Sequence, residues 1–105
     1  MSTAVKDVAQ EMLALAQEIT RKKNPEGALG QVLKGYLERR INECEEEIAK
    51  FENKYGMPFE DYKEMLGVKI TLSYEHEKDY MDWEASVIEY VFLKDEKNKL
   101  DYYGY

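Results

Sequence analysis

The chain contains few of the residues on which most catalytic and metal-binding sites depend. Its 105 residues include one cysteine and one histidine. A single cysteine, Cys44, excludes an internal disulfide and any cysteine-based zinc site. A single histidine rarely makes a metal site alone, and we interpret His76 as a solvated residue ahead of a helix. The sequence shows no serine nucleophile elbow and no glycine-rich phosphate loop. We therefore expect no catalytic, cofactor-binding or metal-binding residue.

Long apolar runs are also missing. No stretch is long enough to serve as a signal peptide or to span a membrane, which predicts a cytoplasmic location by default. Proline is scarce, with 2 residues, while charged residues make up 35% of the chain. Few prolines combined with many charges are typical of long helices. The length of 105 residues predicts a single helical domain over 1–105.

Basic residues are outnumbered by acidic ones, 15 against 22, for a net charge of −7. This deficit argues against direct nucleic-acid binding, because phosphate neutralisation needs a basic surface. The charge is also uneven: residues 1–44 carry 7 basic and 6 acidic side chains (+1), and residues 45–105 carry 8 and 16 (−8). Either the second half meets a basic partner, or it is a well-solvated acidic surface.

A first helix is predicted over 1–25. Its apolar residues are spaced alternately by three and four positions: Val5, Val8, Met12, Leu15 and Ile19. Ser2 and Thr3 are suitable N-cap residues for this helix. Asn24 followed by Pro25 ends it, because the residue before a proline is disfavoured in the helical conformation.

A longer second helix, 26–55, carries a strict heptad seam. The seam alternates spacings of four and three: Leu37, Ile41, Cys44, Ile48, Phe51 and Tyr55. This spacing is typical of coiled coils. Such a seam packs either against the final helix of the same chain or against a second copy, and we predict that it is the seam of a homodimer.

A turn, a short third helix over 58–66 and an extended segment follow. Gly56 suits a left-handed C-cap, and Pro58 suits the first turn of a new helix. Residues 68–74 alternate apolar and polar side chains, the period of an extended segment. That segment is a connector or an edge that pairs with another chain; isolated strands are unstable, which favours the connector. The predicted fold class is all-α, a long helical hairpin with a short third helix and a C-terminal helix.

The C-terminal helix is predicted over 77–98, with a tail over 99–105. Its apolar residues form more than one stripe. One stripe holds Tyr80, Trp83, Val87 and Tyr90, and another holds Met81, Ile88 and Phe92. One stripe can pack on the long helix, whereas the other stays exposed in a monomer, which is typical of an interface.

The turn and the final helix carry a resemblance to a known group of proteins. The segments KYGMPFEDY and DYMDWEA are similar to patterns in small, acidic prokaryotic proteins taken for antitoxin halves of type II toxin–antitoxin pairs. The matching residues are Lys54, Tyr55, Gly56, Met57, Phe59, Glu60, Tyr62, Asp79, Tyr80, Asp82, Trp83 and Glu84. The resemblance covers roughly the C-terminal half; the intervening GVKITLSYE is longer and more β-prone than the pattern. It implies a protein that binds and neutralises a toxin.

We therefore predict a non-enzymatic interaction module that binds a basic, toxin-like partner such as a ribonuclease. Tyrosine and tryptophan dominate binding energy at interface centres. The predicted partner-binding residues are Tyr80, Asp82, Trp83, Glu84, Val87, Tyr90, Tyr102 and Tyr103. In the alternative interpretation, Trp83 and Tyr80 anchor the final helix in the core.

Two other functions stay open at this point. A structural helical homodimer needs only the seam. A Mg²⁺-dependent, all-α nucleoside triphosphate pyrophosphatase-like enzyme needs carboxylates converging on the metal. The candidates for that enzyme are Glu43, Glu46 and Glu47 on one helix with Asp79 and Asp82 on another.

Overall fold

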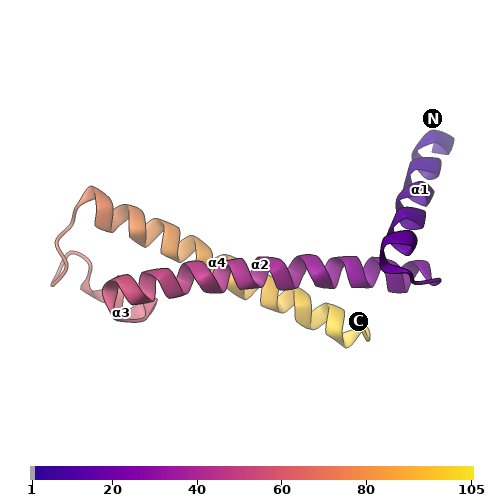
Figure 1. Ribbon diagram of the computed structural model, residues 1–105. Helices are drawn as coiled ribbons and strands as arrows, with labels where there is room; N and C mark the ends of the chain where they lie inside the picture. The colour runs from indigo at the N-terminus through magenta and orange to yellow at the C-terminus, as the bar shows by residue number, and fades with distance from the viewer. Residues whose placement is uncertain (1) are drawn as a thin grey trace. The chain divides into compact units, whose positions relative to one another are not determined.

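The computed structural model describes residues 2–105, with side chains from residue 7 onward. It contains four helices: α1 (Ser2–Thr20), α2 (Pro25–Tyr55), α3 (Phe59–Met65) and α4 (Tyr74–Tyr102) (Figure 1). No strand occurs among the described residues, so the predicted all-α class is confirmed. The predicted capping by Ser2 and Thr3 and the placement of Val5 involve side chains outside the described ones.

The chain divides into two compact units. The central unit is Arg39–Asp95, and the terminal unit combines Met1–Glu38 with Glu96–Tyr105. The charge divides with them. From the sequence, the terminal unit has seven basic and seven acidic side chains, a net of zero, and the central unit has eight basic and fifteen acidic, a net of −7. The whole charge imbalance of the protein therefore lies in the central unit.

The junction between α1 and α2 is set by short-range chemistry. Arg21 adopts a left-handed φ of 58°, which stops α1 at Thr20, before the predicted end. The Asn24 side chain then accepts hydrogen bonds from the backbone N–H groups of Glu26 (2.8 Å) and Gly27 (3.2 Å). These bonds satisfy donors that a helix start otherwise leaves unpaired. Pro25 fits the first helical position, where an N–H is not needed.

The turn between α2 and α3 follows its sequence signals. Gly56 has φ 67°, and its N–H donates to the Glu52 carbonyl at 2.7 Å. Pro58 precedes α3 in an extended conformation, and its carbonyl accepts from Asp61 and Tyr62. The glycine stop is confirmed, because it depends only on a local backbone preference. Pro58 lies one position before the helix and not in its first turn, so α3 is shorter than the predicted 58–66.

The segment between α3 and α4 is a connector. A single bridge joins Leu66 to Ile70, and the Gly67 N–H donates to the Ile70 carbonyl at 2.7 Å. Ser73 then begins α4: its Oγ accepts from the His76 N–H at 3.1 Å. This cap explains why α4 starts at Tyr74, three residues before the predicted start. At the other end α4 continues to Tyr102, through most of the predicted tail.

The core of the central unit is aromatic. Phe51 from α2, Phe59 and Tyr62 from α3, and Trp83 from α4 are buried together. The Trp83 ring lies 5.5 Å from Phe51, 5.4 Å from Phe59 and 5.2 Å from Tyr62, measured between centroids. Such ring pairs add stabilisation beyond the area they bury. Trp83 thus fastens α4 onto both α2 and α3.

Candidate functional site

The heptad seam of α2 is covered from within the chain. Ile41, Cys44 and Phe51 are buried, and Ile48 and Tyr55 are half-buried. Phe51 lies in the Trp83 cluster, with Ile48 and Tyr55 packed against it. These seam residues of the central unit therefore pack against the final helix of the same chain, which was one of the two arrangements predicted for the seam. Leu37, also half-buried, belongs to the terminal unit.

The predicted partner-binding residues separate into two groups. Trp83 is fully buried, and Tyr80 and Val87 pack against its cluster. This placement gives Trp83 and Tyr80 the core role that was kept as an alternative, and it removes Trp83 from any surface a partner can reach. Tyr90 is half-buried as well. The physical reason is that these four residues share the face of α4 that points at α2.

The other predicted partner-binding residues stay accessible to solvent. Asp82 is exposed and pairs with Lys78 at 2.7 Å, while Glu84 is half-buried and accepts from the Tyr80 hydroxyl at 3.4 Å. Tyr102 and Tyr103 are exposed at the end of α4, in the terminal unit. Two acidic residues and two tyrosines of the predicted set therefore remain available for contacts.

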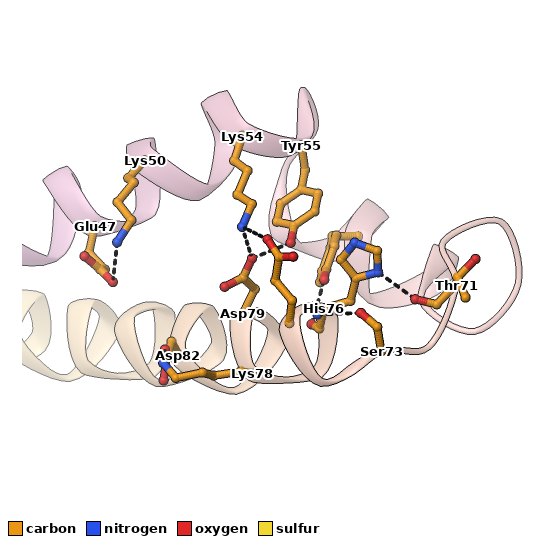
Figure 2. A network of polar contacts seen from close by, with 12 residues as sticks. Glu47, Lys50, Lys54, Tyr55, Thr71, Ser73, His76, Lys78, Asp79 and Asp82 are labelled. Carbon is orange, nitrogen blue, oxygen red and sulfur yellow. Dashed lines mark hydrogen bonds and ion pairs between the residues drawn. The ribbon is translucent and has the colours of Figure 1, made fainter.

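A polar network joins the end of α2 to the start of α4 (Figure 2). The Lys54 ammonium donates to Glu75 at 2.8 Å and to Asp79 at 2.6 Å. The Tyr55 hydroxyl also donates to Asp79, and the Tyr62 hydroxyl donates to the His76 carbonyl at 2.7 Å. The His76 ring lies against the Thr71 carbonyl, 2.6 Å from its Nδ1. These contacts hold the hairpin closed beside its aromatic core.

Three groups of this network, Lys54, Tyr55 and Asp79, have pKa values displaced by their contacts. Burial acts to raise the pKa of Asp79, but hydrogen bonds from Lys54 and Tyr55 outweigh it and leave that pKa below its usual value. Burial and then the bond to Asp79 raise the pKa of Tyr55 well above its ordinary value. The bonds to Asp79 and Glu75 raise the pKa of Lys54 in the same way. All three shifts move the pKa further from pH 7, so they keep Lys54 charged, Tyr55 neutral and Asp79 ionised in these contacts.

The carboxylates of the magnesium-enzyme alternative do not converge. Among the described residues, no group of three or more His, Cys, Asp or Glu side chains could hold a metal ion. Four of the five candidates are instead paired with nearby cations. Glu43 pairs with Arg40 at 2.9 Å and Glu47 with Lys50 at 3.7 Å. Asp79 and Asp82 pair with Lys54 and Lys78. The described side chains therefore do not assemble the constellation that the enzyme alternative needs.

The strongest candidate surface lies on the opposite face of α4 from Trp83. Met81 is 67% exposed, Ile88 63% and Phe92 56%, and Ala85 between them is also exposed. Their spacing of four, three and four positions makes one straight stripe on a helix. We call Met81, Ala85, Ile88 and Phe92 the α4 stripe. The three large side chains were predicted from the sequence as the stripe left exposed in a monomer, and the exposure is confirmed.

Acidic side chains border the α4 stripe on both sides. Glu77 and Glu84 follow one edge, and Asp82 and Glu89 follow the other, as helical spacing requires. Beside Ala85 the surface opens into a hollow of about 510 Å³ between α2 and α4. It is lined by Arg40, Glu43, Cys44, Glu47, Ala85, Ser86 and Glu89.

The internal cations only partly balance these charges. Arg40 bridges Glu43 and Glu89 across the hollow, and Lys78 binds Asp82. Carboxylates still outnumber cations along the stripe and its hollow. Burial raises the pKa of the Cys44 thiol there, so that thiol is a weakly reactive part of the wall. The role of the acidic border was missed from the sequence, although the spacing of Glu77, Asp82, Glu84 and Glu89 around the apolar positions carried the signal.

Comparison with known proteins adds no relative to this picture. No protein family, curated protein or solved structure matches the chain. Over the described residues, no helix combines the length and apolar character needed to cross a membrane.

Proposed function

We propose that this protein is a non-enzymatic interaction module that binds a basic partner protein on the α4 stripe. The observation that carries the proposal is the exposed row of Met81, Ile88 and Phe92 with carboxylates on both edges. A contiguous apolar row held in water is costly unless a partner covers it. Fully burying one large apolar side chain contributes about 1.5–3 kcal/mol, so three of them can carry a specific contact.

The geometry favours an amphipathic helix as the bound element. A stripe with spacings of four and three accepts apolar residues spaced in the same way on a second helix. Lysine or arginine beside those residues would lie against the carboxylates that border the stripe. Opposite charges across an interface mainly raise the association rate and exclude wrong partners. The preferred partner therefore presents an apolar helical face with basic edges.

A second copy of the same stripe is a poor occupant. In a parallel pairing of two α4 stripes, the Glu77 and Glu84 edge of one copy faces the Asp82 and Glu89 edge of the other. In an antiparallel pairing each acidic edge faces its own equivalent. Both arrangements bring like charges together, which is destabilising. The charge pattern thus favours a basic partner and disfavours self-association at this surface.

The antitoxin form of the proposal rests on the resemblance of the KYGM turn and the DYMDWEA helix. In this form the partner is a basic, ribonuclease-like toxin, which the protein neutralises. Half of the resembling residues, including Tyr55, Phe59, Tyr62 and Trp83, lie in or against the core of the central unit. They would therefore act as the frame that presents the α4 stripe, while Asp82 and Glu84 contribute to its border.

A synthetic helix tests the proposed chemistry directly. The probe is a labelled amphipathic peptide of about three heptads, with leucine at the apolar positions and lysine or arginine on both edges. Fluorescence anisotropy should show saturable binding to the full chain. The same peptide with glutamate edges should bind at least about 10-fold more weakly. Equal binding of both peptides would sink the proposal of a basic partner.

Two variants locate the binding surface. Met81→Glu combined with Ile88→Glu should abolish peptide binding, because it places two more carboxylates within the stripe. The matched control, Met12→Glu with Leu15→Glu on α1, should bind the peptide like the wild type. The toxin form requires a small basic reading frame beside this gene, and the absence of one would contradict it. Such a reading frame is to be expressed alone and with each variant. Growth should be rescued by the wild type and by the α1 control only.

A further inference from the structure

The apolar face of α1 is uncovered. Met12 is 65% exposed and Ile19 75%, and Val8 and Leu15 are each 55% exposed. We call Val8, Met12, Leu15 and Ile19 the α1 stripe; their spacings of four, three and four match those of the α4 stripe. Among the residues of the terminal unit whose burial is described, only Ala28 and Gly30 are buried. The terminal unit therefore gives α1 almost no buried apolar surface of its own to pack on.

A helix in this state requires a tertiary contact. Isolated helices shorter than about 12–15 residues are marginal in water, and most helical stability in proteins comes from packing an amphipathic face. The 19 residues of α1 exceed that length only slightly. Nearby on α2, Leu29, Val32 and Leu33 are also more than 40% exposed. The terminal unit thus exposes two apolar surfaces in need of cover.

The exposed side chains of α1 allow a second occupant besides the basic partner on α4. Fully burying a large apolar side chain is favourable, because it removes apolar surface from water. All four side chains of the α1 stripe are more than half exposed. Covering them can therefore stabilise a second contact.

Charge identifies that second occupant. The terminal unit has a net charge of zero, so two copies of it meet without the repulsion that the central unit would impose. The edges of the α1 stripe differ from each other: Ala9 and Ala16 lie on one side, and Glu11 and Glu18 on the other. When two such helices pair in parallel, each glutamate edge faces an alanine edge. Small alanine side chains also let the two helices approach closely.

We propose that α1 is the self-association helix of this protein and that its stripe packs in parallel against the α1 stripe of a second copy. The homodimer expected from the sequence then forms through α1, whereas the seam of α2 serves the intramolecular hairpin. The two stripes have different occupants because only the α4 stripe has acid on both edges. This inference is independent of the identity of the basic partner.

Sedimentation equilibrium on the full chain tests the proposal. The wild type should have twice the 12.4 kDa chain mass at tens of micromolar. Met12→Glu with Leu15→Glu should weaken self-association about 100-fold or more, since it buries charge in place of two apolar side chains. The matched control, Met81→Glu with Ile88→Glu, should remain a dimer. Trp83 is the single tryptophan and is buried, so its fluorescence reports whether the central unit stays folded in each variant.

Each other result would overturn the inference. A monomeric wild type, or a dimer that survives the α1 substitutions, removes α1 from the contact. Loss of the dimer in the α4 variant would show that α4, and not α1, carries self-association. The parallel arrangement has its own readout: Val8→Cys in a Cys44→Ala background should form a covalent dimer on oxidation, because a disulfide needs Cα atoms within about 7 Å. A dimer that fails to cross-link through residue 8 would exclude the parallel pairing.

Discussion

At the scale of single residues, Trp83 and Asp79 both join α4 to the end of α2 in the central unit. Trp83 contacts aromatic rings from α2 and α3, and within the described structure its indole Nε1 has no hydrogen-bond partner. A buried donor left unpaired costs about 1–3 kcal/mol. Trp83 therefore stabilises the fold through the packing and volume of its ring, whereas its unpaired N–H is destabilising.

Replacing Trp83 should distinguish packing from hydrogen bonding. Trp83→Ala should lower the free energy of unfolding by about 3–5 kcal/mol, the usual cost of removing a buried aromatic side chain. Trp83→Phe should cost clearly less, because it keeps a ring and removes the unpaired N–H. Urea denaturation followed by circular dichroism measures both. A Trp83→Ala protein as stable as the wild type would contradict the core assignment.

Asp79 should make stability depend on acidity. Its pKa in the folded protein lies below the value of about 3.9 expected when unfolded. The carboxylate therefore contributes its full stabilisation above about pH 4, and this is lost as the pH falls through the folded pKa. Asp79→Asn should destabilise the protein by about 1 kcal/mol or more at pH 7, with a smaller difference at pH 2–3. Denaturation of both proteins at the two pH values tests this; an unchanged difference would refute it.

At the scale of the elements, glycine and polar caps set where the helices end. Gly56 has a left-handed backbone, whereas Gly35 lies within α2 and a Cβ added there meets no atom within 4 Å. Gly30 is a third case: an added Cβ would come within 2.5 Å of the Tyr105 ring. Gly56 is therefore needed for its backbone conformation, Gly30 for close packing, and Gly35 for neither.

Alanine at the first two positions should change stability in opposite directions. Gly56→Ala should cost about 1–2 kcal/mol, the penalty for a left-handed residue with a side chain. Gly35→Ala should stabilise the protein by up to about 1 kcal/mol, because alanine favours a helix interior. The midpoint of urea denaturation provides the comparison. Destabilisation by both changes would mean that Gly35 takes part in a contact outside the single chain.

At the scale of the whole molecule, the division of charge matches the division into units. All of the net −7 lies in the central unit, which also bears the α4 stripe, and the terminal unit is neutral. Long-range electrostatic attraction would thus direct a basic partner to the central unit. Self-association through the neutral unit would depend on apolar contact alone.

The two association reactions should therefore respond differently to salt. Raising ionic strength from about 0.1 M to 1 M shortens the screening length from about 10 Å to 3 Å. The association rate of the basic peptide should fall about 10-fold or more. The dimer dissociation constant should change far less. Stopped-flow anisotropy and sedimentation measure the two quantities; a salt-independent peptide association rate would contradict electrostatic steering.

Short-range features of this protein were determined by its sequence. The all-α class, the stop at Gly56, the start of α3 after Pro58 and the exposed row of Met81, Ile88 and Phe92 all follow from local backbone preference and helical period. The start of α4 at Tyr74 was missed because the Ser73 cap lies in a segment with strand-like alternation. A cap of this kind forms when a side chain accepts a hydrogen bond from a nearby backbone N–H. The periodicity of apolar residues does not reveal such a bond.

Only the tertiary structure decided which apolar face is interior. Trp83 and Phe92 both look like binding residues in sequence, yet one is fully buried and the other more than half exposed. From the sequence, the α2 seam could pack either on a second copy or on α4. The structure places Trp83 of α4 against Phe51 of the seam, which is the second arrangement. Likewise, only the tertiary structure showed that Glu43, Asp79 and Asp82 form ion pairs with arginine or lysine. Period determines which residues share a helical face, but which face is covered depends on contacts between residues far apart in the chain.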